Sequence, residues 1–339
     1  MTHFGAGPPQ DDASRREDRS IPHDLLSDIA RRLSDMGYHF TTVTPETHRR
    51  FLQHREDVLA STLRDVWGWN MPFATGLLEP EVHTALQEAG LIVPEGNRWR
   101  SRIRFSSLGN AAYLHSGYPT QESDAVFFGP DTYRFVTLVL RYLESHAGPI
   151  TRVLDVGCGG GAGGLMAAKT VADRGAPAPV VELVDINARA LAMAGVNAQS
   201  LGVADVAYRR ADLYAGTRPG LDLVVANPPY LVDADERLYR HGGGELGFDL
   251  ALRIVAEGVS FLAPGGALVL YTGSPIVGGR DLFREAVEPW THADGIAAKY
   301  HEIDPDVFGE ELERPAYRNV ERIAAVGLVV RRVASCGGP

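Results

Sequence analysis

Short apolar runs alternate with amphipathic segments over the second half of the chain. The runs predict strands at residues 151–156, 180–185, 205–209, 221–226 and 266–272, with two last strands near 296–303 and 322–333. Apolar positions at helical spacing predict helices at residues 131–144, 161–174, 187–200 and 247–262. This alternation indicates an α/β fold, with a doubly wound, mostly parallel sheet covered by helices on both faces.

The first part of the chain follows a different pattern. Helical spacing starts at His23 and ends at Gly37, and it returns at residues 46–65 and 80–89. Two extended runs then meet at Glu95-Gly96-Asn97, which is a hairpin signal. We expect a smaller helical, winged-helix-like recognition domain at residues 21–124 and the α/β domain at 125–335. Residues 1–20 have few large apolar side chains, so we expect a disordered leader there.

Arginines recur with a period of two after the hairpin turn. Arg98, Arg100, Arg102 and Arg104 therefore predict a basic stripe on one face of a strand, while Ile103 points the other way. We expect this stripe to contact the substrate. One interpretation is a solvated strand face that meets acids of the neighbouring domain; the other is a contact with phosphates or an acidic partner.

Composition narrows the class of protein. The 339 residues carry 33 Lys and Arg against 43 Asp and Glu, a net charge of −10 that argues against a protein that coats nucleic acid. Cys158 and Cys336 are too few for a disulfide framework, and no Cys and His cluster has zinc-site spacing. No run approaches the ~20 apolar residues of a membrane span. We expect a cytoplasmic protein with no metal and no membrane contact.

A glycine-rich turn joins the strand at 151–156 to the following helix, within the sequence VLDVGCGGGAGGL at residues 153–165. Such a turn lets a ligand approach backbone amides at a helix N-terminus. Gly159, Gly161 and Gly164 fit G-x-G-x-x-G, and Asp185 ends the next strand, as in a nicotinamide-dinucleotide site. A dinucleotide-dependent oxidoreductase is therefore one alternative.

Asp155 precedes Gly157 by two residues, which gives D-x-G-x-G-x-G. This pattern resembles the first motif of class I S-adenosylmethionine-dependent methyltransferases, which have a seven-stranded Rossmann-like sheet. The resemblance implies S-adenosylmethionine as cofactor, with Asp155, Gly157, Gly159 and Gly161 near its methionine end. Asp185 can accept hydrogen bonds from both ribose hydroxyls. Asp212, after the third strand, matches the position that holds the adenine amino group, although a helix N-cap is its simpler interpretation.

The fourth strand ends in Asn227-Pro228-Pro229-Tyr230, at the edge of the sheet where α/β proteins bind ligands. This tetrapeptide resembles the signature of methyltransferases that modify planar nitrogens. The Asn227 side chain and the Pro228 carbonyl can hold the acceptor N–H groups, the prolines fix the backbone, and Tyr230 offers a flat face. The resemblance implies that these four residues are catalytic, that Asn227 also touches the cofactor and that Tyr230 binds the substrate.

Two flanking segments resemble release-factor glutamine methyltransferases, namely PDTYRF at residues 130–135 and the segment 242–270 after the tetrapeptide. The resemblance implies N-methylation of a protein glutamine, in a release factor or another translation component. The alternative is an adenine amino group in RNA or DNA, which the arginine stripe favours. A non-catalytic module that keeps the cofactor pocket is a third alternative.

Overall fold

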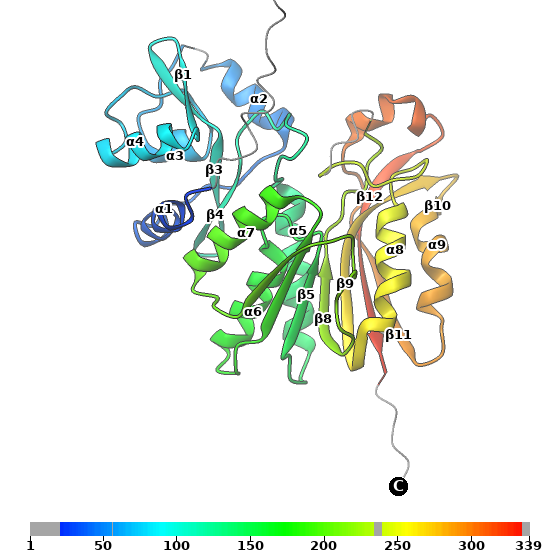
Figure 1. The fold of residues 1–339 in the computed structure, drawn as a ribbon. Helices are drawn as coiled ribbons and strands as arrows, with labels where there is room; N and C mark the ends of the chain where they lie inside the picture. Colours follow the sequence, from blue (N-terminus) through cyan, green and yellow to red (C-terminus); the bar gives the residue numbers. More distant parts are fainter. Residues whose placement is uncertain (1–20, 56, 234–238, 334–339) are drawn as a thin grey trace, which may run out of the picture.

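The computed structural model describes residues 21–55, 57–233 and 239–333 (Figure 1). The expected leader at 1–20 lies outside these residues. The first part contains α1 (His23–Asp35), α2 (Pro45–Gln53), α3 (Leu63–Trp67) and α4 (Pro80–Glu88), then the hairpins β1 (Ile92–Glu95) with β2 (Arg98–Ser101) and β3 (Ile103–Leu108) with β4 (Ala111–Ser116). The single helix predicted at 46–65 is thus wrong. Two helices form instead, because Thr62 and Asp65 make a capping box that starts α3 afresh.

The predicted arginine stripe does not form a single face. β2 pairs with β1 and β3 pairs with β4, so the strand changes partner at Arg102 and the alternation of side chains is interrupted. Arg104 is 3% exposed and its Nε donates to the carbonyl of Gly68 over 2.8 Å. The expectation of four guanidinium groups side by side is therefore wrong.

The large sheet confirms the predicted fold class. Its strands are β5 (Arg152–Val156), β6 (Val180–Asp185), β7 (Val206–Arg210), β8 (Leu221–Ala226), β9 (Leu262–Val277), β11 (Ile296–Asp304) and β12 (Arg322–Arg332). Their order is β11-β12-β9-β8-β5-β6-β7, and the two-residue β10 (Arg280–Asp281) adds a short pair at the end of β9. β5 to β9 run parallel, whereas β12 is antiparallel to both of its neighbours.

Helices cover both faces of this sheet. Successive side chains of each strand point to opposite faces, so that Val153 and Leu223 join one apolar core and Leu154 and Val224 join the other. The first core includes α5 (Pro130–Ser145), α6 (Ala162–Asp173) and α7 (Ala188–Leu201). The second includes α8 (Asp249–Gly258), the short turn η2 (Val259–Phe261) and α9 (Leu282–Thr291). The sequence reading missed α9, which has a proline within it, and also missed β4.

The first part of the chain packs directly on the α/β part. α1 and β4 lie along α7, as Figure 1 shows, and apolar side chains of all three share one core. Asn197 on α7 accepts a hydrogen bond from the Leu114 amide at 2.7 Å and donates to the carbonyl of Gly160 at 2.9 Å. One amide side chain therefore ties β4 to the glycine-rich turn. None of the helices described is long and apolar enough to span a membrane.

Candidate functional site

The glycine-rich turn leaves β5 and crosses over the end of β6. The amides of Gly157 and Cys158 both donate to the carbonyl of Val184, at 2.9 and 3.0 Å. Gly157 and Gly159 have φ angles of +66° and +52°, which side chains rarely adopt, and a Cβ on either would meet nothing within 4 Å. The backbone is thus bare where it faces the pocket, so a ligand can approach it closely.

Asp155 is buried at the end of β5 beneath this turn. Its Oδ2 accepts the amide hydrogen of Gly164, in the first turn of α6, at 2.7 Å. Burial raises the pKa of Asp155 to about 7, against the effect of that hydrogen bond. A cationic group placed beside this carboxyl stabilises its charged form, so the site suits an ammonium group.

The carboxylate of Asp185 stands at the end of β6 and lines the same pocket. It accepts the amide hydrogens of Gly159 and Asn187 at 2.9 and 2.8 Å. Burial raises its pKa despite these bonds. The carboxylate is thus held in place, with further lone pairs available to ribose hydroxyls.

Asp212 lines this pocket, as the resemblance implied, whereas Gly161 does not. Asp212 lines the pocket, forms a surface ion pair with Arg253 at 3.0 Å and lies in a turn after β7, so it is not a helix N-cap. Gly161 is not among the pocket-lining residues: a Cβ there would meet Leu165 at 2.9 Å. Gly161 therefore serves the packing of α6.

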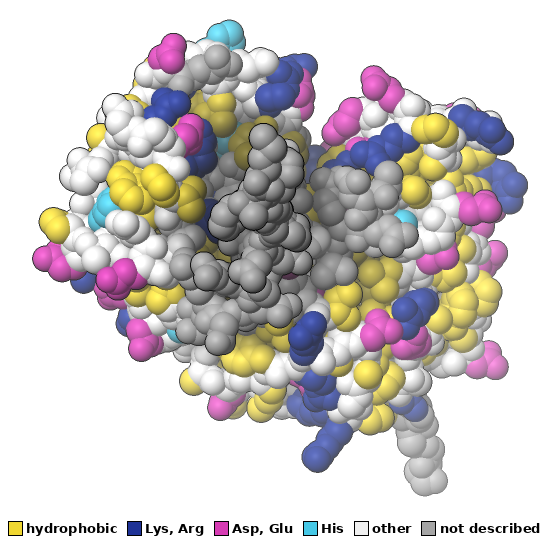
Figure 2. Space-filling model, turned by 45° about the horizontal axis from the view of Figure 1, so that its top comes forward, with side chains coloured by type: hydrophobic (Ala, Val, Ile, Leu, Met, Phe, Trp, Pro, Cys, Tyr) yellow, Lys and Arg dark blue, Asp and Glu magenta, His cyan; other side chains and the backbone are white. Residues whose placement is uncertain are grey.

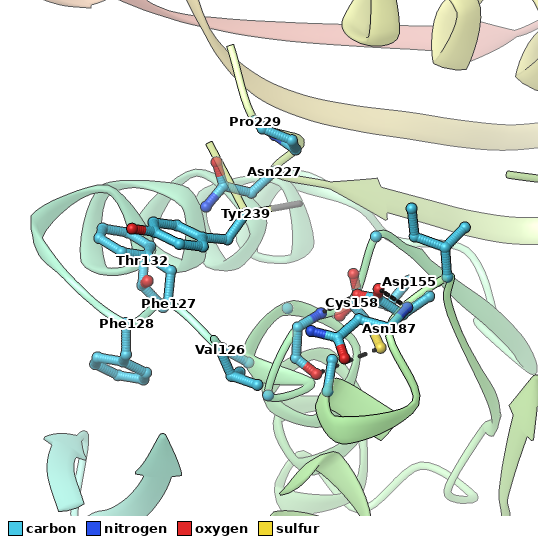
Figure 3. A pocket seen from close by; sticks show the side chains of 18 of the residues that line it. Val126, Phe127, Phe128, Thr132, Asp155, Cys158, Asn187, Asn227, Pro229 and Tyr239 are labelled. Atoms are coloured by element: carbon cyan, nitrogen blue, oxygen red, sulfur yellow. Dashed lines mark hydrogen bonds between the residues drawn. The ribbon is translucent and has the colours of Figure 1, made fainter. Parts of the chain in front are cut away.

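The pocket extends from these acids to the tetrapeptide after β8 (Figure 3). We call it the cofactor pocket; its lining includes Phe127, Asp155, Gly157, Gly159, Asp185, Asn187, Asp212, Asn227, Pro229 and Tyr239. Cys158 also lines it, and burial raises the pKa of its thiol well above the ordinary value, so the thiol is not a reactive thiolate. The lining thus combines bare backbone at the glycine-rich turn with the carboxylates of Asp155, Asp185 and Asp212, groups that can bind an ammonium group, hydroxyls and an amine.

A second pocket lies on the other side of the tetrapeptide. We call it the acceptor pocket; it is lined by Pro45, Tyr118, Pro119, Thr120, Gln121, Phe127, Asp131, Asn227, Pro228, Pro229, Tyr230, Leu231, Tyr239, Arg240 and Phe308. Phe127, Asn227, Pro229 and Tyr239 line both pockets. The side chain of Asn227 makes no hydrogen bond with another described residue, so its amide is available where the two pockets meet.

The glycine-rich segment after the tetrapeptide packs against it. A Cβ on Gly242 would come within 2.6 Å of the Pro229 carbonyl oxygen, and one on Gly247 within 2.5 Å of the Tyr230 carbonyl oxygen. These contacts are between backbones. The two glycines therefore allow one loop to support the tetrapeptide from behind.

Tyr230 is more enclosed than the sequence predicted. It is 7% exposed, and its hydroxyl donates to Asp131 at 2.8 Å. Burial and Asp131 raise the pKa of Tyr230 well above the ordinary value, so its hydroxyl stays protonated and keeps donating. Its ring lines the acceptor pocket from a fixed position.

None of the four predicted substrate-binding arginines lines either pocket. Arg98 and Arg100 form ion pairs with Glu95 of their own hairpin, and Arg100 also donates to the carbonyl of Asn70. Arg100 and Arg102 line a neighbouring groove, which shares Tyr118, Pro119, Thr120 and Gln121 with the acceptor pocket. On the face seen in Figure 2, Lys and Arg side chains are spread among acidic ones.

Several residues of the acceptor pocket escaped the sequence reading. Tyr118 stacks on His48, with ring centroids 4.0 Å apart, and Tyr239 donates to the carbonyl of Thr120 at 2.8 Å. The only signal for Asp131 was its place in PDTYRF. The others carry no local signal, because their role depends on contacts between distant parts of the chain.

Comparison with known proteins agrees with this geometry. Residues 135–288 match the family model of the methyltransferase small domain. The chain is 36% identical over 161 residues to a release factor glutamine methyltransferase of Deinococcus radiodurans, covering 44% of this chain and 55% of that protein. Identity to the Bordetella pertussis protein of the same name is 35% over 181 residues, covering 49% and 63%.

A ribosomal protein uL3 glutamine methyltransferase of Neisseria meningitidis is 32% identical over 109 residues, covering 29% of this chain and 36% of that protein. This chain thus spans between about half and two thirds of the length of the two release-factor enzymes. The resemblance to class I S-adenosylmethionine-dependent methyltransferases, and to release factor glutamine methyltransferases among them, is confirmed. In the described parts of the chain, no group of three or more His, Cys, Asp or Glu side chains could hold a metal ion.

Proposed function

We propose that the protein transfers the methyl group of S-adenosylmethionine to the side-chain amide nitrogen of a glutamine in another protein. The observation that carries this proposal is the position of Asn227 and Pro229, which line both the cofactor pocket and the acceptor pocket. Groups placed there can touch a donor on one side and an acceptor on the other.

In this proposal the cofactor supplies a methyl group activated by a sulfonium. The residues around the cofactor pocket bind and orient it: Asp155 faces the ammonium end, Asp185 accepts from the ribose hydroxyls and Asp212 accepts from the adenine amino group. Asp212 is the weakest of these contacts, since it is exposed and shares its charge with Arg253.

The tetrapeptide acts on the acceptor. An amide nitrogen is a poor nucleophile because its lone pair is delocalised, and positive charge grows on it as the new bond forms. The side-chain oxygen of Asn227 and the backbone oxygen of Pro228 accept its two N–H groups and stabilise that charge. One of these protons then leaves for solvent, and the N-methylated amide remains.

A protein acceptor is favoured over a nucleic acid by the charges near the site. Of the arginines that favoured RNA or DNA, Arg98 and Arg100 pair with Glu95 and Arg104 is buried, which leaves Arg102 exposed. Arg240 of the acceptor pocket pairs with the buried Glu311. Curated relatives that act on release factors and on a ribosomal protein support a translation component as the partner. The experiment must distinguish this acceptor from the alternative, an adenine amino group.

The test is incubation with methyl-labelled S-adenosylmethionine and a lysate of cells that lack the protein. We expect label that protease releases and nucleases do not, and that acid hydrolysis converts to volatile methylamine. An Asn227→Ala variant gives the background. Label released by ribonuclease or deoxyribonuclease would establish the adenine alternative, and no label above background would contradict the proposed function.

A further inference from the structure

One carboxylate outside the tetrapeptide contacts it directly. Asp131 is the second residue of α5, where the helix dipole favours a negative charge. It is 4% exposed and lies in the wall of the acceptor pocket. A buried carboxylate is costly unless it is paired, so its partners are informative.

Three side chains from three elements converge on Asp131. The hydroxyls of Tyr230 and Tyr271 donate to its two oxygens, at 2.8 and 2.7 Å. Arg134 donates at 3.2 Å to the oxygen that Tyr271 also uses, and pairs with Asp304 at 2.7 Å. Tyr271 lies on β9 and lines neither pocket. Of these three partners, Tyr230 is the one that belongs to the tetrapeptide and connects Asp131 to it.

The Tyr230 ring has little other freedom. A Cβ on Gly273 would lie 2.2 Å from its Cδ2 atom, so the ring rests directly on the β9 backbone. The hydroxyl bond to Asp131 fixes the far end of the same ring. Pro228 and Pro229 each fix a backbone φ angle between Asn227 and Tyr230, so a displacement of the Tyr230 backbone is passed on to the Pro228 carbonyl and Asn227.

We propose that Asp131 is a positioning residue for methyl transfer: through the Tyr230 hydroxyl it holds the tetrapeptide where Asn227 and Pro228 meet the acceptor. This inference rests on the proposed function for its kinetic consequence, while the structural consequence stands by itself. Misplacement by about 1 Å can cost about 10²-fold in rate, which sets the scale of the expected effect.

The kinetic test is a double-mutant cycle of Asp131→Asn and Tyr230→Phe. The asparagine keeps the volume but has one acceptor oxygen for two hydroxyls, and it turns N–H groups toward them. With labelled S-adenosylmethionine and the lysate protein fraction, each single variant should lose about 10- to 100-fold in apparent kcat. The KM for S-adenosylmethionine should stay within about threefold. The apparent kcat of the double variant should be no more than about threefold below that of the less active single variant, since both changes act on the same hydrogen bond.

Tyr300→Phe is the matched control, because the Tyr300 hydroxyl also donates to a carboxylate, Asp281, at 2.8 Å, away from both pockets. It should lower the melting temperature and leave kcat within about twofold. Three results would overturn the positioning role. They are a double variant whose rate loss is the product of the two single losses, an unchanged rate in Asp131→Asn, and an equal rate loss in Tyr300→Phe.

Hydrogen exchange of the peptide 227–233 tests the same inference without activity. Asp131→Asn and Tyr230→Phe should raise its exchange rate about tenfold, and Tyr300→Phe should not. If the natural protein transfers no label, the proposed function fails, and the exchange rates of the three variants alone test the positioning role of Asp131. Unchanged exchange in both variants would contradict the inference even if the protein is an active methyltransferase.

Discussion

The cofactor pocket and the acceptor pocket meet at Asn227 but are built in different ways. The polar groups of the cofactor pocket stand at the ends of successive strands, at Asp155, Asp185 and Asp212. The acceptor pocket combines segments as far apart as Pro45 and Phe308. The proposed cofactor contacts thus come from local strand-end motifs, whereas the proposed acceptor contacts come from tertiary packing of distant segments.

Asn227→Ala should break the link between the two pockets and have the largest effect. Because it removes an acceptor for the charge that develops on nitrogen, apparent kcat should fall by about 10²- to 10³-fold. The Kd for S-adenosylmethionine, measured by calorimetry, should change less than about threefold. Asn319→Ala, at an exposed position, is the control. Equal loss of binding and rate would mean that Asn227 serves the cofactor pocket alone.

Asp155 gives the cofactor pocket a pH signature between the acidic and the neutral range. Its pKa is about 7 when folded against an ordinary value of 3.8, so the folded protein keeps a proton that the unfolded chain has lost between these pH values. The stability contributed in this way is complete below about pH 4 and is lost as pH rises through about 7.

Urea unfolding of the cofactor-free protein at pH 5, 6 and 7 tests this signature. Relative to Asp155→Asn, the natural protein should lose about 1 kcal/mol of unfolding free energy per pH unit, close to the limit of ~1.4 for one proton. Parallel pH curves for the two proteins would show that Asp155 titrates normally.

Gly273→Ala should disturb only the acceptor side. The added methyl group displaces the Tyr230 ring from β9, so we expect about tenfold slower transfer with normal cofactor binding. Gly327→Ala on β12 is the control, since its Cβ would meet His301 at 2.8 Å away from both pockets. It should cost stability and keep the rate. Equal rate losses in the two variants would assign the effect to general destabilisation.

Removing Arg98 and Arg100 together should have the smallest effect. Each pairs with Glu95 on the surface, where such pairs contribute about 0–1 kcal/mol. We expect transfer rates within about twofold of the natural protein at both 50 and 300 mM salt. If the transfer rate of the natural protein depends on salt and that dependence disappears in the double variant, these arginines contact phosphates.

The same contrast explains what the sequence could predict. The strands β5, β6 and β8 are short apolar runs bounded by turns, and the motifs lie at their ends, so the fold and the candidate cofactor residues follow from local pattern. Arg104 shows the limit: its spacing matched the other arginines, but the change of strand partner at Arg102 buried it. α9 was missed because Pro289 interrupts its helical pattern.

The contact between Asp131 and Tyr230 joins residues 99 positions apart. Each of the two lies in a sequence motif of its own, yet no periodicity predicts that the two side chains meet. The division of the chain at residues 124 and 125 stays a prediction, since α1, β4 and α7 share one core.

A crystal structure with S-adenosylhomocysteine, the expected product, tests the central claim most directly. We predict the homocysteine ammonium beside Asp155, the ribose hydroxyls on Asp185 and the sulfur on the side of the cofactor pocket where Asn227 and Pro229 form the wall. Adenosine bound elsewhere, or a sulfur turned away from Asn227, would contradict the account of two pockets that meet at the tetrapeptide.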